Sequence, residues 1–471
     1  MNKIIFKSLT LLLLVLAVSC NKNRIEPDPK PEVEENANLA SVGFTLADNP
    51  LLGQSVYSYN VGEYFYLSVP ESADLKALKA NFSVATGSKV YIKDVEQVSG
   101  VTVSDFSDIV TVKVVSSTGK YTKSYFVYAK YGNMDIDKRV YKFMTDYSIP
   151  GVSISVMKDE KIIYSSGYGF SIEESRTKTS ADHLYRLASV SKQFTTLCIM
   201  TLYERGLLNI DSNVFGEGGI LDKQFPGVTG EKATVTVRNL LQHNSGWPTS
   251  PDPMFSSIRD GKTLDDLINY VLGLELSHAP GSTYSYYNMG FGILGRVVEV
   301  VSGKEYEKFL KEDVLKPMGI TDIHVGGGQD ERRSNECVYY SQDGTNGYGN
   351  PMRVIAAAGG IIASTNQLMK VLAHIDGRSG VADILKPETL ELMYNSPTSN
   401  YARYSLGWRI GHNLYPGAHY HSGNLAGTTA IWVGNTNSGM SAALLCNSRS
   451  YISGYDDAYY ILMGEIIDFF E

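Results

Sequence analysis

Ser189-Val190-Ser191-Lys192 opens a mostly apolar run that continues from Phe194 to Leu202. An apolar run of this length predicts a buried helix with Ser189 at its N-terminus. One helical turn places positions i and i+3 on the same face, so Lys192 can reach the hydroxyl of Ser189 and accept its proton. The N-terminus of a helix also favours developing negative charge. This stretch therefore predicts a serine nucleophile with a lysine base.

Four other stretches share the Ser-x-x-Lys pattern and begin at Ser19, Ser117, Ser155 and Ser175. The first lies in the N-terminal apolar segment, and the second runs through a Thr-Gly turn signal. The third lies on an alternating run that predicts a strand, where side chains three apart do not share a face. The fourth lies in a polar loop with nothing apolar to bury. Only the pattern at Ser189 is expected to carry chemistry.

Length and charge limit the classes of protein that this chain can belong to. Its 471 residues favour two to three domains. The formal net charge is −8 at pH 7, so no basic stripe is available for nucleic acid and no nucleic-acid partner is expected. Beyond the N-terminal segment, no apolar run is long enough to span a bilayer.

The N-terminus has the pattern of an export signal. Lys3 and Lys7 precede the apolar run from Leu9 to Val18, and a small residue stands immediately before Cys20. The segment resembles the lipobox of bacterial lipoproteins, which implies lipidation of Cys20 and attachment to the cell-envelope membrane. An ordinary secretory signal with a chance cysteine is the alternative. We expect a signal peptide over 1–20 and a proline- and acid-rich tether over 21–37.

Residues 38–131 read as a small all-β domain. Short alternating runs are separated by turn signals, as in 64–69, 90–92, 110–115 and 125–128. This spacing predicts an antiparallel sandwich. The stretch is similar to immunoglobulin-like modules of bacterial envelope lipoproteins. It holds no cluster of catalytic residue types, so we interpret it as a spacer or interaction module.

Residues 134–471 combine helices with strands at both ends. A sheet built from distant parts of the chain and flanked by helices is therefore expected, which is an α/β (α+β) fold. The expected elements are a helix over 135–147, a hairpin over 152–164, strands over 418–421, 428–433 and 441–446, and a final helix over 456–470.

The three cysteines beyond Cys20 do not form a disulfide framework, because their number is odd. Cys198 and Cys446 lie in apolar runs and are expected in the core, and a single bridge to Cys337 is left open.

Two further motifs follow Ser189 in order. Tyr286-Tyr287-Asn288 lies between a Pro-Gly-Ser turn and an apolar helix-like run, and His421-Ser422-Gly423 leads into a strand-like run. Together with Ser189-x-x-Lys192, these motifs strongly resemble the penicillin-recognising serine hydrolases of the class C type. That group includes class C β-lactamases, D-alanyl-D-alanine carboxypeptidases, D-amino-acid peptidases and related esterases. Supporting matches occur at 240–246, 358–360 and 406–408.

The resemblance implies a β-lactamase/transpeptidase-like fold, in which an antiparallel sheet is flanked by helices and joined by a helical subdomain. It also implies a role for each matched residue. Ser189 would be acylated, Lys192 would be its base, and Tyr286 would shuttle the proton. Asn288 and the stretch His421, Ser422, Gly423 and Asn424 would bind substrate, with the main-chain N–H groups of Ser189 and Asn424 as the oxyanion site.

One departure from the family pattern bears on specificity. The chain has no Lys-Ser/Thr-Gly, and His421 stands in that place. A histidine is expected to be only partly charged near neutral pH, whereas the lysine supplies a fixed charge. This substitution favours the peptidase and esterase branches over a dedicated β-lactamase. No cofactor is expected, and a metal pair of His419 and His421 is disfavoured because no third ligand is evident.

Three hypotheses follow from the sequence. The first is an envelope-anchored serine hydrolase acting on peptidoglycan-derived or D-amino-acid peptides. The second is the same chemistry on β-lactams or carboxylic esters. The third is a catalytically silent receptor or scaffold.

Overall fold

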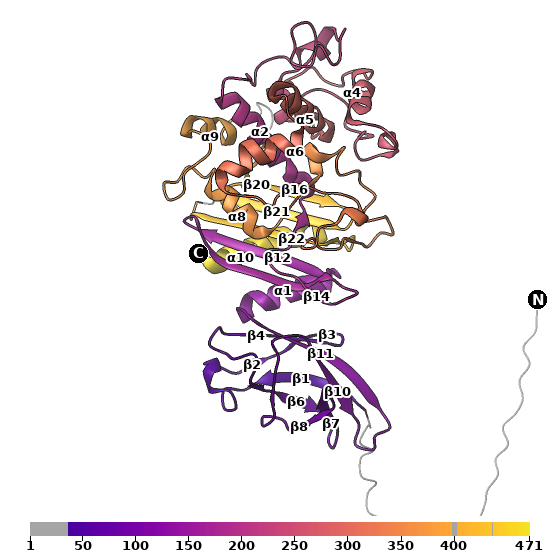
Figure 1. Cartoon of the computed structure of the whole chain (residues 1–471), viewed down its shortest axis with the longest axis vertical. Coiled ribbons are helices and arrows are strands. Elements are labelled where there is room, and N and C mark those ends of the chain that lie inside the picture. The colour runs from indigo at the N-terminus through magenta and orange to yellow at the C-terminus, as the bar shows by residue number, and fades with distance from the viewer. Residues whose placement is uncertain (1–35, 398–402, 436) are drawn as a thin grey trace, which may run out of the picture.

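The computed structural model describes residues 36–397, 403–435 and 437–471. These residues form two units stacked along the long axis of the molecule, a smaller strand-rich unit and a larger mixed unit (Figure 1). The predicted signal peptide, Cys20 and the tether up to residue 35 lie outside the described residues.

The smaller unit has two main sheets that face each other across one core, and a third, two-stranded sheet formed by β5 and β9. Three strands pair in the order β2-β1-β6 and six in the order β3-β4-β11-β10-β7-β8. Phe44, Phe65 and Phe106 are fully buried between the sheets. The strands are β1 Leu39–Phe44, β2 Val56–Tyr57, β3 Tyr59–Val61, β4 Tyr64–Val69, β5 Leu78–Lys79, β6 Asn81–Val84, β7 Lys89–Ile92, β8 Val95–Gln97, β9 Val103–Ser104, β10 Val110–Val115 and β11 Thr122–Tyr131.

The larger unit is built on a seven-stranded sheet whose order is β14-β13-β12-β22-β21-β20-β19. Residues 151–178 form one half and residues 409–446 the other, and Ile154 pairs with Leu444 where the halves meet. The fold class predicted from the sequence, one antiparallel sheet made from distant parts of the chain, is confirmed. The strands are β12 Gly151–Lys158, β13 Lys161–Ile172, β14 Thr177–Lys178, β19 Arg409–His412, β20 Tyr415–Leu425, β21 Thr428–Gly434 and β22 Met440–Cys446.

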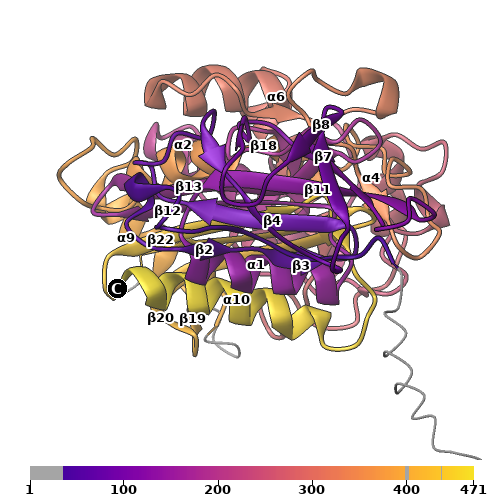
Figure 2. The ribbon, with the colours of Figure 1, turned by 90° about the horizontal axis from the view of Figure 1, so that it is seen from below.

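Each face of this sheet is covered by helices. Helices α1 (Met134–Asp146) and α10 (Tyr455–Phe470) run side by side on the face turned toward the smaller unit (Figure 2). The other face carries the helical layer that holds the largest hydrophobic cluster, where Phe194 stacks on Trp432. Both faces of the sheet can be covered in this way because successive side chains of β21 point to opposite faces.

Over the described residues, the helical layer consists of eight short or medium α-helices. They are α2 Ser191–Glu204, α3 Val237–Leu241, α4 Leu264–Leu272, α5 Asn288–Ser302, α6 Tyr306–Phe309, α7 Ala356–Gly359, α8 Thr365–Ala373 and α9 Pro387–Tyr394. Small strands complete the unit: β15 Tyr185–Arg186, β16 His324–Val325, β17 Tyr340–Ser341, β18 Ile361–Ala363 and β23 Ser448–Arg449.

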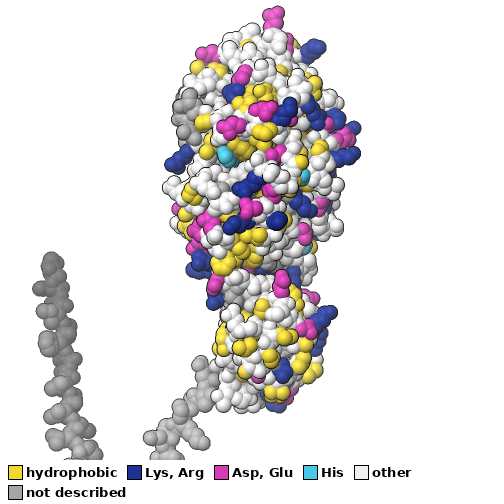
Figure 3. Space-filling model, turned by 90° about the vertical axis from the view of Figure 1, so that its left-hand side faces the viewer, with side chains coloured by type: hydrophobic (Ala, Val, Ile, Leu, Met, Phe, Trp, Pro, Cys, Tyr) yellow, Lys and Arg dark blue, Asp and Glu magenta, His cyan; other side chains and the backbone are white. Residues whose placement is uncertain are grey.

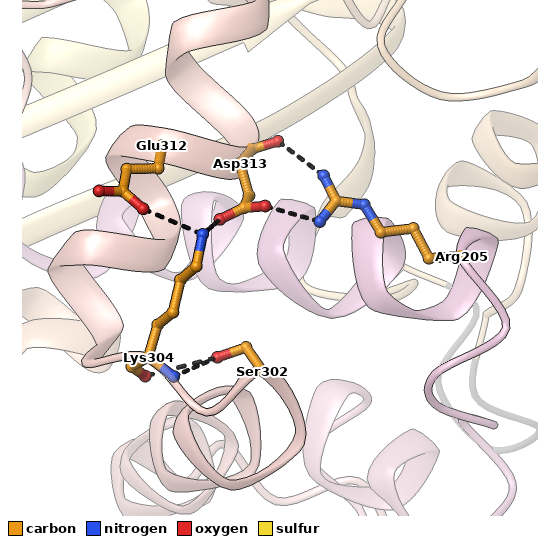
Figure 4. Close-up of polar contacts among 5 residues, drawn as sticks. All are labelled: Arg205, Ser302, Lys304, Glu312 and Asp313. Carbon is orange, nitrogen blue, oxygen red and sulfur yellow. Dashed lines mark hydrogen bonds and ion pairs between the residues drawn. The ribbon is translucent and has the colours of Figure 1, made fainter.

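An ion-pair network ties the far end of α2 to the turn after α5. Asp313, in the π-helical segment Leu310–Leu315, accepts hydrogen bonds from Lys304 Nζ at 2.6 Å and from Arg205 Nη1 at 2.7 Å (Figure 4). Lys304 Nζ also lies 3.0 Å from Glu312 Oε2. The network fixes the end of the helix whose other end carries Lys192.

The two units meet through aromatic rings and one buried ion pair. Tyr66 of β4 stacks on Tyr141 of α1 with ring centroids 4.1 Å apart. Lys130 Nζ of β11 lies 3.3 Å from Asp137 Oδ1 of α1 and 3.4 Å from the ring centroid of Tyr168. Burial lowers the pKa of Lys130 to about 8, although Asp137 opposes the shift.

The surface and the core add three observations. On the face drawn in Figure 3, side chains of both charge signs are interspersed, and neither sign forms a continuous field. Within the described residues, no helix has the length and apolarity needed to cross a bilayer. Cys198, Cys337 and Cys446 are buried free thiols.

Candidate active site

Ser189 lies in a tight turn just before α2. The sequence predicted a helix that begins at Ser189, but α2 begins at Ser191 and Ser189 belongs to the 3₁₀ turn η2, Ala188–Val190. Ala188 enters this turn with a φ of +48°, a conformation that residues other than glycine seldom adopt. The hydroxyl of Ser191 accepts a hydrogen bond from the main-chain N–H of Ile361 at 3.0 Å. The turn is therefore held against a neighbouring strand.

Lys192 is the base that this turn presents to Ser189. Its Nζ lies 3.0 Å from Ser189 Oγ and 2.8 Å from the carbonyl oxygen of Ala358, and the side chain is fully buried. Burial lowers the pKa of Lys192 to about 7. Asp252 raises this pKa and Arg409 lowers it, both by smaller amounts. About half of the lysines are thus neutral at pH 7 and can accept a proton.

Tyr286 closes the cluster from the segment that leads into α5. Its side chain is within hydrogen-bonding reach of Ser189, and Lys192 Nζ lies 5.1 Å from its ring centroid. Burial raises the pKa of Tyr286 above its ordinary value. The hydroxyl thus keeps its proton at neutral pH and can pass one on, since a phenol both donates and accepts.

Asn288 is the first residue of α5 and is held by an acidic neighbour. Its Nδ2 donates to Asp252 Oδ2 at 2.8 Å, so the orientation of the amide is fixed by a charged acceptor. Its Oδ1 is buried and has no hydrogen-bond partner among the described residues.

His421 belongs to a directional chain of hydrogen bonds. The main-chain N–H of Tyr287 donates to His243 Nδ1 at 3.1 Å, which places the proton of His243 on Nε2. That Nε2 lies 3.0 Å from the hydroxyl of Tyr404, which lies 3.1 Å from His421 Nε2. His421 Nδ1 lies 2.6 Å from the carbonyl oxygen of Ser422. Each group therefore donates to the next one: His243 Nε2 donates to the Tyr404 hydroxyl, and the Tyr404 hydroxyl donates to His421 Nε2.

Both imidazoles in this chain of hydrogen bonds, those of His243 and His421, are neutral. Burial lowers the pKa of His421 and of His243 well below the ordinary value, and nearby Arg409 and Lys192 lower both further. The expectation of a partly charged histidine near neutral pH does not hold here, because burial beside two cations disfavours the imidazolium. Both ring nitrogens of His421 also form hydrogen bonds within the protein.

The residues after His421 alternate between the two faces of the sheet. Ser422 Oγ lies 2.6 Å from the hydroxyl of Tyr460 on α10, and Asn424 Nδ2 lies 3.5 Å from the hydroxyl of Tyr459. These two side chains therefore face α10 and not the nucleophile. Any contribution of Ser422 or Asn424 to the site has to come from the main chain.

Gly423 brings that main chain against the nucleophile turn. A Cβ at this position would lie 2.3 Å from the carbonyl oxygen of Leu187 and 2.7 Å from the main-chain nitrogen of Ser189. Only glycine allows such an approach. Strand β20 and the turn η2 thus set Asn424 and Ser189 beside each other, as an oxyanion site formed by their N–H groups requires.

Four residues of the site carry no role in the sequence prediction. His243 lies inside the supporting match at 240–246, and Tyr404 and Arg409 flank the match at 406–408. Asp252 lies in a loop with no motif. Gly407 accounts for the match at 406–408, since a Cβ at this position would overlap Thr196 Oγ1 of α2. The loop is therefore seated on the nucleophile helix, and its flanking residues reach the site.

Arg409 is a cation that lies beside two aromatic rings of the site. Its guanidinium carbon lies 5.9 Å from the ring centroids of Tyr286 and Tyr404. Its Nε is buried without a hydrogen bond, and no ion pair involves Arg409 among the described residues. Asp252, on the helical side, is close enough to act on Lys192 with the opposite sign.

His419, the other histidine of β20, lies outside this cluster, with its ring against Tyr394 at 4.3 Å between centroids. Among the described residues, no group of three metal-ligating side chains is placed to hold an ion.

The sheet with its helical cover, together with Ser189 and Lys192, defines the fold of a serine hydrolase. The family model described as Beta-lactamase matches residues 136–463, and the chain belongs to that family. The resemblance seen in the sequence is thereby confirmed for the larger unit. The resemblance of residues 38–131 to immunoglobulin-like modules stays a prediction.

Curated relatives include Protein flp of Staphylococcus aureus strain MRSA252, which is 30% identical over 202 residues. That match covers 42% of this chain and 39% of the relative, so the chain spans about two fifths of its length. A putative D-alanyl-D-alanine carboxypeptidase of Escherichia coli K12 is 22% identical over 304 residues, which is 57% of this chain and 70% of the relative.

Solved structures share the fold. The octameric penicillin-binding protein homologue from Pyrococcus abyssi is 26% identical, with a TM-score of 0.57 over 70% of this chain and 76% of that one. The D-amino acid amidase from Ochrobactrum anthropi SV3, complexed with L-phenylalanine amide, is 21% identical, with a TM-score of 0.57 over 72% of this chain and all of that one.

Proposed function

We propose that this protein is a serine hydrolase that removes the C-terminal residue from short peptides containing D-amino acids. The observation that carries the proposal is Arg409, a cation beside the Ser189, Lys192 and Tyr286 cluster that forms no ion pair with any residue the structure describes. Arg409 is half-buried, and a partly desolvated charge is stabilised by an opposite charge, so a substrate anion is expected beside it. A peptide with a free C-terminal carboxylate supplies it.

In the proposed reaction, Lys192 takes the hydroxyl proton of Ser189 as Oγ attacks the scissile carbonyl carbon. The oxyanion forms beside the main-chain N–H groups of Ser189 and Asn424. Tyr286 passes a proton to the leaving amine and receives the proton held by Lys192, the C–N bond breaks, and Ser189 is left acylated. Water then attacks the ester with its proton passing to the same relay, which releases the acid and restores Ser189.

The state of His421 supports a special role for Arg409. His421 replaces the family's lysine, yet it is neutral and both of its ring nitrogens are occupied. The fixed charge that the lysine would supply is therefore met by Arg409, from a neighbouring strand. An Arg guanidinium also binds a carboxylate in two-pronged fashion.

The comparisons support the same class of substrate. One relative is named as a putative D-alanyl-D-alanine carboxypeptidase, and one structural neighbour is a D-amino acid amidase. Because the chain spans only part of its first relatives, their activity does not transfer to it without a test.

Arg409→Ala tests the proposal, with Arg403→Ala as the matched control. Arg403 is exposed on the same segment. We expect KM for D-alanyl-D-alanine peptides to rise at least tenfold in Arg409→Ala, and hydrolysis of p-nitrophenyl acetate, which has no carboxylate, to change less than threefold. An equal loss on both substrates would assign Arg409 a structural role. Absence of D-alanine release by the unmodified protein would reject the carboxypeptidase.

β-Lactams are a second candidate substrate, because most of them also carry a carboxylate that Arg409 can bind. Steady hydrolysis of nitrocefin, lost in Ser189→Ala, would support β-lactamase activity. Acylation of Ser189 without turnover would leave the peptidase as the better assignment. If Ser189 reacts neither with penicillins nor with fluorophosphonates, the silent receptor is favoured.

We also propose that the protein is exported and anchored to the envelope membrane through Cys20, on the periplasmic side or at the cell surface. The charged, apolar and small-residue pattern before Cys20 supports this. Metabolic labelling with a palmitate analogue should mark the full chain and not Cys20→Ala. Labelling that persists in the variant would contradict the anchor.

A further inference from the structure

Asp252 is the carboxylate of the site for which the proposed mechanism has no use. Its Oδ2 accepts from Asn288 Nδ2 at 2.8 Å, and its Oδ1 accepts from the main-chain N–H of Met254 at 2.9 Å. Both bonds come from neutral donors. Among the described residues, no lysine, arginine or histidine forms an ion pair with Asp252, and the charge of Asp252 acts on the Lys192 base only from beyond ion-pair distance.

The loop that carries Asp252 is fixed in place. Arg259 Nη1 donates to the carbonyl oxygen of Met254 at 3.0 Å and to Asn350 Oδ1 at 2.9 Å. Arg259 Nη2 reaches the carbonyl oxygen of Gly349 at 3.2 Å. The carboxylate is thus held half-buried at the site and cannot simply turn into bulk water.

Asp252 and Arg409 give the site two opposite charges. Arg409 comes from the sheet, at the start of β19, and Asp252 from the helical layer, beside the first residue of α5. Both act on Lys192 and on Tyr286 with opposite signs. A substrate that lies along Ser189 therefore meets a cation on one element and an anion on another.

A zwitterion is the chemical class that balances both charges. Asn288 Oδ1 is buried and accepts no hydrogen bond from the part of the chain that the structure describes, so it adds a second acceptor next to the Asp252 carboxylate. Two acceptors side by side suit a group that has several N–H donors, and an ammonium has three. A peptide whose α-amino group is blocked leaves the carboxylate without a counterion.

We propose that Asp252 and Asn288 bind the free α-ammonium group of the residue that acylates Ser189, so that the preferred substrates are unblocked dipeptides of D-amino acids. The proposal rests on the proposed function and deepens it, because it places the free amino group on the acyl residue itself.

The test compares D-alanyl-D-alanine with its N-acetyl derivative in the full protein and in Asp252→Asn. The substitution keeps the shape of the side chain and removes its charge. We expect the unmodified protein to prefer the free amine at least tenfold in kcat/KM. Asp252→Asn should lose at least tenfold on the free amine and less than threefold on the acetyl peptide. Asp260→Asn, an exposed aspartate of the same loop, should change neither rate.

A pH series adds an independent readout. The α-ammonium of a peptide loses its proton near pH 8, so the preference for the free amine should fall above that pH. Equal losses on both substrates in Asp252→Asn would make Asp252 a positioning residue for Asn288 and overturn the proposal. A preference for the acetyl peptide would overturn it as well.

Failure of the proposed function is distinguished by two further measurements. D-Alanine p-nitroanilide and its N-acetyl form lack the carboxylate, so discrimination between them supports Asp252 even if no dipeptide is cleaved. If nothing is turned over, protection of Ser189 against a fluorophosphonate by each dipeptide gives the same comparison. Equal protection by the free and acetyl forms would reject the ammonium site.

Discussion

Lys192 connects the geometry of the site to a measurable pH dependence. A charged lysine cannot accept the proton of Ser189, and burial sets the pKa of Lys192 to about 7. The neutral fraction rises as pH rises through this value, so reactivity gains on the alkaline side and is lost on the acid side. The nearby imidazoles of His243 and His421 are already neutral where Lys192 titrates, because their pKa values are lowered, so they add no further step to the pH–rate profile there.

We expect the second-order rate of Ser189 acylation by a fluorophosphonate to fall about tenfold per pH unit below pH 6. Above about pH 8 it should level off, because nearly all of Lys192 is then neutral. Rates measured between pH 5 and 9 will check this. A profile that is flat from pH 5 to 9 would contradict Lys192 as the base.

Tyr404 has a positioning role, because its hydroxyl joins His243 to His421. We expect Tyr404→Phe to lower kcat/KM about tenfold with a smaller change in KM, since both imidazoles lose a partner while substrate contacts persist. Nitrogen NMR of the histidines should show altered tautomers. Tyr415→Phe is the matched control, because that buried hydroxyl has no hydrogen-bond partner among the described residues. Unchanged tautomers in Tyr404→Phe would contradict the chain of hydrogen bonds.

At the scale of elements, the site depends on how closely strand β20 approaches the turn η2. The side chains of the strand alternate, and Gly423 is the position where the strand meets the main chain of Ser189. Strand β20 and the turn η2 can therefore approach this closely only because Gly423 has no Cβ.

We expect Gly423→Ala to abolish acylation of Ser189 and to lower the free energy of unfolding by about 1–3 kcal/mol, because a buried Cβ has no room there. Fluorophosphonate labelling and urea denaturation will measure the two effects. Gly328→Ala is the control, since a Cβ at Gly328 meets nothing within 4 Å. Normal labelling of Gly423→Ala would contradict the close approach.

The sequence predicted regular elements better than it predicted the environment of the site. Short apolar, strand-like runs located the strands around Ile154, Ile431 and Leu444, which are buried on both faces of the sheet. The start of α2 was missed by two residues, since no sequence signal marks the left-handed Ala188 before a 3₁₀ turn. Arg409 and Asp252 belong to no motif in the sequence. They reach the site only because the fold brings distant segments of the chain together, so the sequence does not predict their roles.

At the scale of the molecule, the seven-stranded sheet separates the smaller unit from the site. Ser189 lies with the helical layer on one face, while Tyr66 and Tyr128 of the smaller unit cluster with α1 and α10 on the other. Among the described residues, no side chain of the smaller unit belongs to the cluster around Ser189, and the interpretation of this unit as a spacer or interaction module stays a prediction.

The ion pair of Lys130 and Asp137 holds this interface, and its removal should loosen the molecule as a whole. We expect Asp137→Asn to lower the free energy of unfolding by about 3–5 kcal/mol, because Lys130 is left buried without its counterion. Calorimetry should then resolve two transitions, one for each unit. Asp135→Asn, exposed in the first turn of α1, is the control. An unchanged melting profile in Asp137→Asn would show that the aromatic contacts suffice.

The junction at Tyr66 and Tyr141 also bears on which molecules can reach Ser189 in an anchored protein. The chain enters the smaller unit at its end remote from the larger unit (Figure 1). With Cys20 lipidated, the smaller unit would stand between the bilayer and the hydrolase, and the sheet would turn Ser189 away from the smaller unit. Cell-wall precursors still attached to a lipid carrier would then be poor substrates. Soluble fragments released during wall turnover would be the molecules within reach.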